Sequence, residues 1–493
     1  MKHAVDLLAE PLCDLLKSMI MHGHIPSVFL LCSLIPILKD YKGSRMSSSN
    51  YRLIAISSLM LKIFDHIILS LCGNSLAPSE HQFGFQKRKS TTLCTWTVNE
   101  TINYFTNRGS PVFVCCMDLT KAFDCVKLSI LFKKLSDKIP AILIRFLIAS
   151  YVQQRCVVKW DSHTSSTFGI SNGVRQGAVL SPVLFNWYIN DVYKALQKSG
   201  FGCKINQIYF GCLAYADDLA LLAPSREALQ GLINLCYDFF FHHGIKISTN
   251  QDVKKTKTKI LIFGLKVNPS PLMLNGKELP FVDSWEHLGH LVHCDGNSAH
   301  DMNEKRRAIV GKIHSLYQEL GQQDPSVLFT LLRSYVFHLY GCQLWDIFSK
   351  DANRLWATWH KTIKFAYNLP YATHRYLLND LVPYDHIQKQ IISRFMKFQK
   401  TISCSDIAQV RILHSIQSKD YRSVYGRNIG NILRVSGART IKDVNLSNIV
   451  INPVPPGCEW RVNFLKDVLS ERLYGDSLSR DEADLILIQL CVD

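Results

Sequence analysis

The chain has 493 residues, of which 47% are hydrophobic and 19% are charged. This is the composition of a folded protein, so extensive disorder is excluded, and the length leaves room for about three domains. Lys and Arg number 56 against 40 Asp and Glu, which gives a formal net charge of +16. That surplus favours a polyanionic partner, either nucleic acid or an anionic membrane face; a basic protein without such a partner is the alternative.

Cysteine spacing and the length of apolar runs exclude two further classes. The 16 cysteines are scattered, and no two of them stand at Cys-x-x-Cys spacing. We interpret them as reduced intracellular thiols, and no zinc knuckle or zinc finger fits their spacing. The apolar runs at 28–38 and 139–152 do not predict membrane spans, because the first is shorter than the roughly 20 residues required and the second contains Arg145. We therefore expect no membrane partner.

The N-terminal part of the chain favours helices with short connections. Apolar spacing predicts a helix over residues 1–25 and a second helical stretch over 54–72. A short buried strand is expected between them at 34–38. Residues 86–89 contain three consecutive basic residues, which we expect in a loop.

From residue 111 onward, strands alternate with helices, which is typical of an α+β domain. An apolar strand is predicted at 112–117, and it ends in Asp118. Further along, Ser181 is expected to cap a helix, with Pro182 in the first helical position. Gly200 stands where the C-terminal end of that helix belongs.

A second acidic position follows in a predicted β-hairpin. Apolar strands at 208–214 and 219–222 flank Asp217 and Asp218, so two carboxylates are expected at the tip. A capped helix from Ser225 comes next. The helix that begins at Ser225 is expected to end at Gly244. A strand is expected at 260–263, and helices at 315–320, at 326–339 and from about 377 onward, with the last helix beginning at 479–482.

The two acidic positions predict a metal-dependent site if their strands are neighbours. Asp118, Asp217 and Asp218 would then meet at one edge of a sheet, and their mutual repulsion would be costly. Divalent cations remove that cost, and Mg²⁺ prefers oxygen ligands. Two such ions about 4 Å apart activate a hydroxyl and stabilise a leaving phosphate oxygen. The simpler alternative is a solvated Asp-Asp turn.

Several segments carry a resemblance to reverse transcriptases, and they occur in that family's order. Residues 113–124 resemble the first palm motif, residues 173–182 the turn and helix that contact the nucleotide, and residues 215–218 the signature hairpin. The remaining segments are 50–52 and 82–85, which look like finger motifs, 285–289, which resembles the primer grip, and 340–345, which resembles a thumb segment. Together they point to the non-LTR retrotransposon (LINE-type) branch over roughly residues 10 to 400.

The resemblance implies an α+β right-hand polymerase. Residues 1–110 would form the fingers with an N-terminal extension, and 111–265 the palm with the catalytic motifs. Residues 266–376 would form the primer-grip region and a helical thumb, followed by a helical C-terminal region at 377–493.

It also implies roles for the acidic residues. Asp118 and Asp217 would both ligate two Mg²⁺ ions, with Mn²⁺ as an alternative, and Asp218 would be a third, more peripheral carboxylate. Leu119 would contribute its backbone carbonyl to the metal site.

Five further residues would bind the incoming nucleotide. Phe123 stands where the family places a bulky gate against a ribose 2′-OH, although a core Phe is the alternative. Gln176 and Gly177 would contact the nucleotide, since Gly allows a close backbone approach. Arg52 is a candidate for the triphosphate, ahead of Lys39. Lys257 would protonate the leaving pyrophosphate; Lys255 and a solvated basic loop are the alternatives.

Two basic clusters are candidates for the template–primer backbone, because cationic side chains neutralise phosphates. Ordinary exposed charge is the alternative for both. The clusters consist of Lys87, Arg88 and Lys89, and of Lys305, Arg306 and Arg307.

The implied activity is RNA-templated addition of deoxynucleotides to a primer 3′-OH. The implied partners are an RNA template, a DNA primer and deoxynucleoside triphosphates, which places the protein inside the cell, in the nucleus, the cytoplasm or both. Leu53 stands where the family usually has Pro, and neither an endonuclease domain nor a zinc knuckle is evident, so we expect a truncated polymerase part. A catalytically inactive nucleic-acid-binding remnant is the alternative, and a splicing maturase ranks below it.

Overall fold

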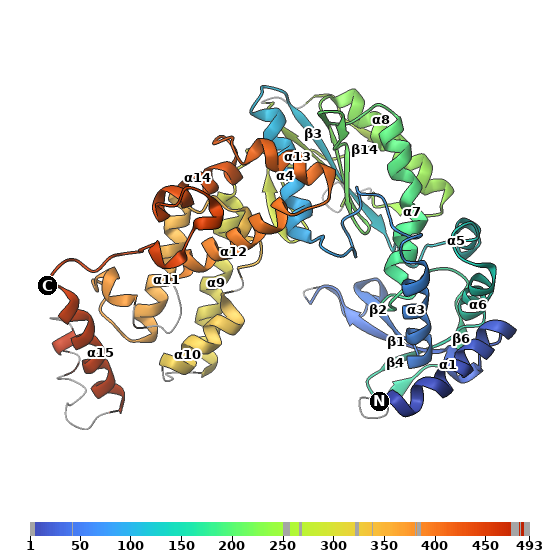
Figure 1. Ribbon diagram of the computed structural model, residues 1–493, viewed down its shortest axis with the longest axis horizontal. Coiled ribbons are helices and arrows are strands. Elements are labelled where there is room, and N and C mark those ends of the chain that lie inside the picture. Colours follow the sequence, from blue (N-terminus) through green and yellow to red (C-terminus); the bar gives the residue numbers. More distant parts are fainter. Residues whose placement is uncertain are drawn as a thin grey trace. The chain divides into compact units, whose positions relative to one another are not determined.

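The chain divides into two compact units (Figure 1). The computed structural model describes residues 5–41, 43–249, 257–265, 269–320, 325–337, 339–379, 381, 386–474, 483 and 485–487. The first unit comprises Met1–Cys94, Val112–Ile262 and Lys266–Val282. The second unit comprises Thr95–Pro111, Phe263–Leu265 and Asp283–Asp493.

One sheet of the first unit contains β1 (Leu31–Leu38) between two partners. Strand β2 (Tyr51–Ile56) pairs with it antiparallel, and β4 (Arg155–Trp160) pairs with it parallel. Strands β5 (His163–Thr164) and β6 (Phe168–Gly169) both pair with β4. The helix predicted over 54–72 is therefore wrong at its start, because 51–56 pairs with β1 as a strand.

The helix that follows β2 begins where a serine caps it. Helix α3 (Leu59–Cys72) starts after Ser58, whose hydroxyl accepts a hydrogen bond from the Leu61 N–H at 3.3 Å. Leu53, the departure from the family pattern, lies in β2 opposite Pro36. The remaining elements at this end are α1 (Val5–His22) and α2 (Ser27–Leu30).

The second sheet of the first unit carries the acidic residues. Its order is β11 (Lys246–Ile247), β3 (Val112–Thr120), β10 (Asp218–Ala223) and β9 (Cys212–Tyr215), with β12 (Lys259–Phe263) also paired to β3. Strand β3 is buried from Val112 to Met117, as expected for a central strand. The predicted strand at 112–117 and the predicted hairpin of β9 and β10 are both confirmed. The strand predicted at 208–214 is wrong at its start, because Ile208–Tyr209 forms a separate short strand.

Helices pack against this second sheet and form the core of the first unit. Helix α8 (Arg226–His242) contacts β3 and β10, and α7 (Ser181–Lys198) lies beside α8 (Figure 1). Ser225 caps α8 as predicted, accepting from the Ala228 N–H at 3.2 Å. The other elements of the unit are α5 (Leu128–Leu135), α6 (Ala141–Val152), and the hairpins β7 (Lys204–Ile205) with β8 (Ile208–Tyr209) and β13 (Met273–Leu274) with β14 (Lys277–Glu278).

The predicted cap of α7 is wrong. Ser181 is the first helical residue and is fully buried, while Leu180 holds the cap position without a side-chain hydrogen bond. The buried carboxylate of Asp65, from α3, accepts the Leu180 N–H at 3.3 Å instead. A negative group at a helix N-terminus satisfies the same need as a cap, but its sequence position is remote.

The second unit is mainly helical, as predicted for the chain after residue 300. Helix α4 (Thr91–Thr106) enters it from the first unit, and Trp96 packs edge-on against Phe398 and Tyr425. The predicted helix 326–339 is wrong at its end, because a π-helical turn replaces the α-helix at Leu332–Val336. The unit's elements are the hairpin of β15 (Ser284–His287) and β16 (His290–His293), and α9 (Ala299–Leu320), α10 (Pro325–Leu331), α11 (Lys350–Ala366), α12 (Ile387–Ser403), α13 (Ala408–Gln417), α14 (Val424–Ser436) and α15 (Glu459–Tyr474).

The structure does not test the predicted last helix start or the predicted domain boundaries. The expected helix start at 479–482 lies outside the described residues. The boundaries drawn at residues 110, 265 and 376 stay predictions.

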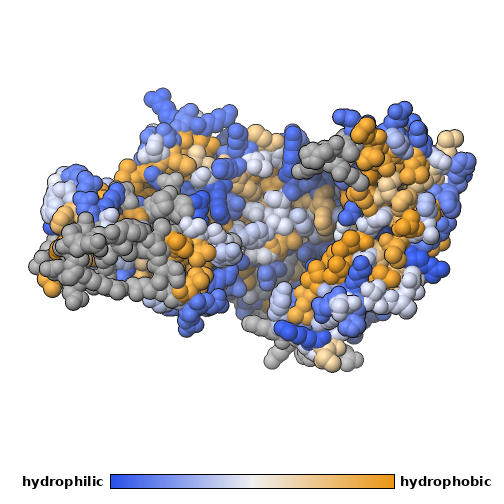
Figure 2. Space-filling view, turned by 90° about the horizontal axis from the view of Figure 1, so that it is seen from below, coloured by the Kyte–Doolittle hydropathy of each residue, from blue (hydrophilic) through white to orange (hydrophobic). Residues whose placement is uncertain are grey.

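Neither the visible surface nor the described helices concentrate apolar residues as a membrane-spanning segment would. Figure 2 shows hydrophobic residues interspersed with hydrophilic ones on the face that it presents. No described helix combines the length and the apolar character that crossing a membrane requires.

Candidate active site

The acidic hairpin is held by a buried glutamine from a remote part of the sequence. Ala216, in the turn between β9 and β10, has a left-handed backbone with φ +56°. The Gln82 side chain accepts the Ala216 N–H at 2.8 Å and donates to the Ala216 carbonyl at 3.2 Å. The same amide donates to the Tyr193 hydroxyl at 2.9 Å and accepts the Gly84 N–H at 2.7 Å. These bonds fix a turn that would otherwise leave buried backbone groups unpaired.

The sheet register brings the three predicted catalytic carboxylates together. Asp118 on β3 stands directly opposite Asp218 on β10, and Asp217 precedes it in the turn. Burial raises the pKa of each of the three carboxyls, and the charge of Asp118 adds to the rise at Asp217. At Asp218, burial and then the charges of Asp217 and Asp118 raise the pKa to about 6. The group is therefore a set of partly desolvated, mutually repelling carboxylates.

Backbone and side-chain contacts hold Asp118 in place. The Asp118 N–H donates to the Thr258 hydroxyl at 3.4 Å, and its carbonyl accepts the Ser248 N–H at 2.8 Å. Lys257 lies with its Nζ 3.7 Å from Asp118 Oδ2, on a largely exposed side chain. Lys255, the alternative to Lys257, lies outside the described residues. Leu119, predicted to offer a carbonyl, is buried in β3 opposite Ile247 of β11.

Cationic side chains gather next to the carboxylates. The pKa of Lys39 is lowered by burial and then by the neighbouring charges of Arg52, Lys121 and Lys257. The charge of Arg52 also acts on Asp217, where it opposes the rise of that pKa. The structure thus places the predicted triphosphate candidates Arg52 and Lys39 near each other, with Arg52 acting on Asp217 of the acidic hairpin and Lys39 acted on by Asp124.

The predicted nucleotide-contacting residues lie in the same unit. The half-buried Phe123 ring stacks on Phe185, with centroids 4.7 Å apart and planes at 16°. The Gln176 side-chain amide donates to Asp124 at 3.2 Å, and the Gln176 backbone carbonyl accepts the Ala55 N–H of β2 at 2.6 Å. Phe123 is thus braced by a core ring, and Gln176 is tied to strand β2.

The backbone conformation at position 177 requires a glycine. Its φ of +101° is a conformation that side chains disfavour, and an added Cβ would approach Ile54 Cγ2 to 3.1 Å and the Ala55 carbonyl to 3.2 Å. The close approach of the 176–177 turn to β2 therefore depends on glycine.

The two basic clusters are placed differently. Lys87 and Arg88 are exposed, whereas the Lys89 ammonium donates to the carbonyls of Gln82 and Glu80 at 2.8 and 3.2 Å. Burial lowers the pKa of Lys89 to about 8. Lys89 thus braces the segment that carries Gln82.

Lys305, Arg306 and Arg307 belong to helix α9 of the second unit. The Lys305 ammonium donates to the Gly289 carbonyl at 3.1 Å, and Arg307 is exposed. The first of these three cations therefore holds the β15–β16 hairpin.

Sequence reasoning missed three residues that shape this site. Gln82 lies within the noted 82–85 segment, but its clamp on Ala216 joins residues far apart in the sequence. Asp124 and Thr258 anchor Gln176 and Asp118 in the same way. The sequence carries no local signal for these contacts, because Thr258 lies between two lysines and Gln82 follows His81 rather than an apolar run.

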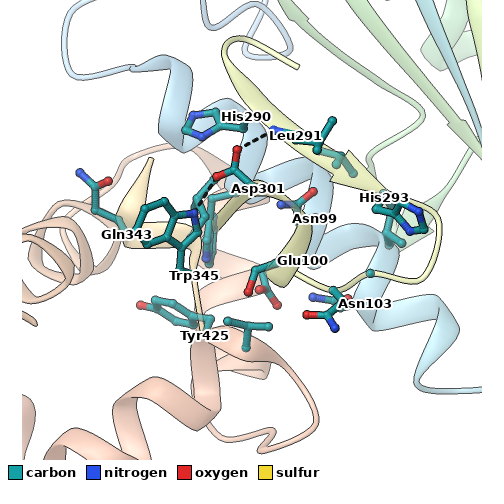
Figure 3. Close-up of a pocket in the computed structure, with 18 of the residues that line it drawn as sticks. Asn99, Glu100, Asn103, His290, Leu291, His293, Asp301, Gln343, Trp345 and Tyr425 are labelled. Atoms are coloured by element: carbon teal, nitrogen blue, oxygen red, sulfur yellow. Dashed lines mark hydrogen bonds between the residues drawn. The ribbon is translucent and has the colours of Figure 1, made fainter. Parts of the chain in front are cut away.

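The second unit contains a cavity of about 60 Å³ lined by both apolar and polar side chains (Figure 3). Asp301 is one of the lining residues. Its carboxylate accepts two hydrogen bonds, from the Leu291 N–H at 3.0 Å and the Trp345 indole N–H at 2.6 Å. Glu100, His290 and Tyr425 also line it. The volume suits a few water molecules, so the cavity fits a hydrated polar core.

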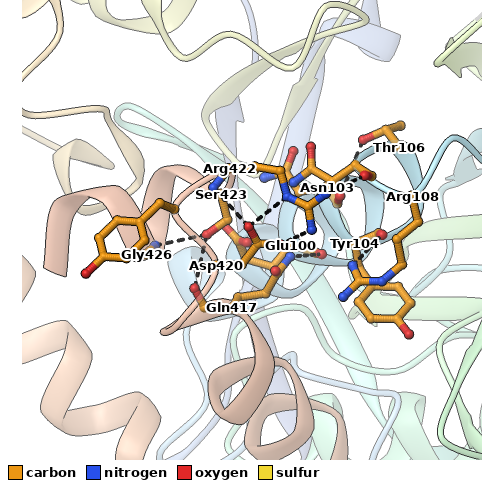
Figure 4. A network of polar contacts seen from close by, with 12 residues as sticks. Glu100, Asn103, Tyr104, Thr106, Arg108, Gln417, Asp420, Arg422, Ser423 and Gly426 are labelled. Atoms are coloured by element: carbon orange, nitrogen blue, oxygen red, sulfur yellow. Dashed lines mark hydrogen bonds and ion pairs between the residues drawn. The ribbon is translucent and has the colours of Figure 1, made fainter. Parts of the chain in front are cut away.

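A polar network continues from the buried Glu100 (Figure 4). Gln417 donates to the Glu100 carbonyl at 3.0 Å, and Arg422 pairs with Asp420 at 2.9 Å. Burial raises the pKa of the Glu100 carboxyl to about 8, so at neutral pH it is largely protonated. The first of these contacts joins α4 to the end of α13.

Three carboxylates at a hairpin beside a central strand, with cations around them, define the centre of a metal-dependent nucleic acid polymerase. A family model described as reverse transcriptase (RNA-dependent DNA polymerase) matches residues 39–288, just over half of the chain. The chain belongs to the reverse transcriptase family. Membership confirms the predicted α+β, right-hand polymerase class.

Curated relatives confirm the resemblance to non-LTR retrotransposon polymerases. The Pol polyprotein of the type-2 retrotransposable element R2DM of Drosophila melanogaster is 23% identical over 304 residues, which cover 58% of this chain and 28% of the relative. The probable RNA-directed DNA polymerase of the Drosophila melanogaster X-element is 25% identical over 338 residues, covering 66% and 36%. The RNA-directed DNA polymerase of the mobile element jockey of Drosophila funebris is 23% identical over 286 residues, covering 56% and 30%. The chain thus spans about a third of the length of these relatives.

Solved structures with some similarity include two yeast telomerases. The apo telomerase of Candida tropicalis has a TM-score of 0.40 at 10% identity, covering 86% of this chain and 70% of that one. Telomerase of Candida albicans in complex with a fragment of telomeric RNA has a TM-score of 0.38 at 12% identity, covering 87% and 68%. Similarity at this level carries no functional information.

Proposed function

We propose that this chain is an RNA-directed DNA polymerase that extends a primer 3′-OH with deoxynucleotides on an RNA template. The observation that carries the proposal is the meeting of Asp118 with Asp217 and Asp218 across the β3–β10 pair. Family membership supplies the reaction class. An intracellular location, nuclear or cytoplasmic, is part of the same proposal, because the enzyme must reach both RNA and chromosomal DNA.

The carboxylates fit the divalent metals that reverse transcriptases use. Hard oxygen donors are what Mg²⁺ prefers, and Mn²⁺ accepts the same donors. Burial and then repulsion between the carboxylates raise the pKa values of Asp217 and Asp218, and bound cations would remove the repulsion. Asp118 and Asp217 would hold two ions, with Asp218 and the Leu119 carbonyl beside them. The bound ions would lower the pKa of the primer hydroxyl and stabilise the leaving phosphate oxygen.

The cationic neighbours orient the triphosphate in this proposal. Arg52 presents a planar fork that pairs with two phosphate oxygens, and Lys39 adds a second positive charge next to it. Lys257, next to Asp118, is close enough to the acidic centre to donate a proton to the leaving pyrophosphate. These cations offset the negative charge that builds up as the phosphate oxygens approach the carboxylates.

Sugar selection follows from a rigid ring. Phe123 is fixed by its stacking on Phe185, so its edge cannot easily move aside for a ribose 2′-OH. Gly177 keeps the neighbouring turn against β2, with no side chain to fill the approach. The proposed preference for deoxynucleotides therefore depends on Phe123.

Primer extension tests the proposal. The full chain is incubated with an RNA template, an annealed DNA primer, deoxynucleotides and Mg²⁺, and product length is measured. We expect extension by the unaltered chain, none above background by Asp217→Asn, and wild-type extension by the control Asp238→Asn, which changes an exposed carboxyl on α8. Equal extension by Asp217→Asn would refute its role.

The same experiment separates the alternative of an inactive binding remnant. A titration of the RNA–DNA hybrid with the unaltered chain measures binding without chemistry. Tight binding without extension, at any Mg²⁺ or Mn²⁺ concentration, would favour the remnant.

A further inference from the structure

A second metal-ligating cluster lies in the second unit, at the junction of β16 and α9. His293 ends β16, Asp295 lies in the connecting turn and His300 is in the first turn of α9. One potential ligand atom from each residue lies within 4.8 Å of the other two. His293 Nδ1 is 3.0 Å from Asp295 Oδ1, and His300 Nε2 is 2.8 Å from Asp295 Oδ2. None of the proposed polymerase chemistry uses these residues.

The two imidazoles are already arranged beside each other. Their rings stack with centroids 3.8 Å apart and planes at 9°, which restricts both side chains. Asp295 is held as well, because its Oδ1 accepts the Asn297 N–H at 2.8 Å. Hydrogen bonds that orient a ligating carboxylate are a regular feature of protein metal sites.

The hydrogen-bonding pattern at His293 favours a lone pair directed at Asp295. The Asp295 N–H donates to His293 Nδ1 at 3.3 Å, so that nitrogen acts as an acceptor. The same Nδ1 lies 3.0 Å from the carboxylate oxygen Oδ1 of Asp295. Two lone pairs that face each other repel, and a cation between them converts the repulsion into two bonds.

The spacing and the atom types select a transition metal. Zn²⁺ bound at 2.0–2.1 Å in a tetrahedron separates its ligand atoms by about 3.4 Å. This separation lies within the 4.8 Å that encloses one donor atom from each of the three residues. Two imidazole nitrogens favour Zn²⁺ over Mg²⁺ and Ca²⁺, which prefer all-oxygen shells. Cys294 supplies a further donor nearby, since its Sγ lies 3.9 Å from His293 Nδ1.

We propose that His293, Asp295 and His300 form a zinc site, with Cys294 or water completing the coordination. The site joins the end of a strand to the start of a helix. Lys305 already ties the same helix to the same hairpin through the Gly289 carbonyl. Zinc would therefore stabilise the docking of the β15–β16 hairpin on α9, a structural role within the second unit.

Zinc binding to the full chain tests the site directly. The tag-free protein is stripped with chelator, and its Zn²⁺ affinity is measured by competition with a chromophoric chelator in excess Mg²⁺, which occupies oxygen-only sites. We expect one equivalent of Zn²⁺ to bind, with affinity lowered at least about 100-fold by His293→Ala or His300→Ala. His314→Ala, which changes an exposed histidine later in α9, should leave the affinity unchanged.

Two further measurements keep the result independent of folding defects. The thermal midpoint of the wild type should rise with Zn²⁺, whereas that of His300→Ala should not respond, with both showing the same circular dichroism without metal. Co²⁺ should give the visible absorption of a four-coordinate site, with a thiolate charge-transfer band that Cys294→Ser removes if Cys294 is a ligand and no such band if water is. Absence of Zn²⁺ binding, or binding that both histidine variants retain, would overturn the proposal.

Discussion

The two units treat buried acidic groups in opposite ways. In the first unit, Asp118, Asp217 and Asp218 crowd together, so the pKa of Asp218 rises through like charges as well as burial. In the second unit, the pKa of Glu100 is raised further, first by burial and last by the charge of Asp420, while Asn103, Ser423 and Arg427 oppose the rise. Repulsion among the carboxylates of the first unit is a cost that a bound cation would relieve, whereas Glu100 avoids the cost by staying protonated.

The acidic residues of the first unit form a candidate active site, whereas those of the second unit belong to a structural hydrogen-bond network. Asp301 in the second unit illustrates the network, because both its oxygens accept N–H groups within the same wall of the cavity. The carboxyls of the first unit instead lie beside cations on exposed side chains such as Lys257. Unrelieved charge beside exposed cations marks the place where a charged substrate fits, and complete pairing marks a place that only stabilises the fold.

Breaking the Gln82 clamp should give the largest effect. Gln82→Ala removes four hydrogen bonds, three of them to the turn of the acidic hairpin and its neighbour Gly84. A displacement of the carboxylates by about 1 Å costs about 100-fold in rate, so we expect at least that loss of primer extension per folded molecule. Single-turnover extension with a pre-bound hybrid measures it.

A buried glutamine of the second unit is the matched control. Gln417 donates to the Glu100 carbonyl, so Gln417→Ala truncates an equally buried glutamine and removes one hydrogen bond. It should lower the thermal midpoint but leave extension by the folded fraction unchanged. Equal losses of extension in the two variants would contradict the distinction between the units.

Local patterns in the sequence predicted the acidic hairpin well. Apolar strands on both sides of Asp217 and Asp218 allowed a hairpin, and β9 and β10 form it. Strand β2 was missed, because the spacing of Ile54 and Ile56 suits either period over a short run. The pairing of β2 with β1 decides in favour of the strand, and no local signal shows that pairing.

Contacts between remote residues limited what could be predicted of the sites. The Gln82 clamp and the Asp65 carboxylate at the start of α7 join segments more than a hundred residues apart. The cluster of His293, Asp295 and His300 was missed for a different reason. Cysteine spacing directed attention to zinc fingers, whereas these ligands come from the end of a strand, a turn and the start of a helix.

The raised pKa of Asp218 predicts that protons compete with the metal. Below about pH 6 its carboxyl is protonated in the metal-free site, so each metal that binds must displace a proton. The Mg²⁺ concentration for half-maximal extension should fall by up to about tenfold per pH unit as the pH rises toward 6, and then level off. Glu100→Gln should leave this profile unchanged, because Glu100 belongs to the second unit.

Titration of Glu100 should appear in stability instead. Its pKa rises from 4.5 to about 8 on folding, so between these values the folded chain binds more protons than the unfolded chain. Stability therefore falls as the pH rises through this window, by at most about 1.4 kcal/mol per pH unit. Glu100→Gln should flatten the dependence of the thermal midpoint on pH and raise the midpoint at pH 8 by a few degrees. Glu304→Gln, at an exposed position on α9, should change neither, and an unaltered slope in Glu100→Gln would show that the carboxyl is ionised in the folded protein.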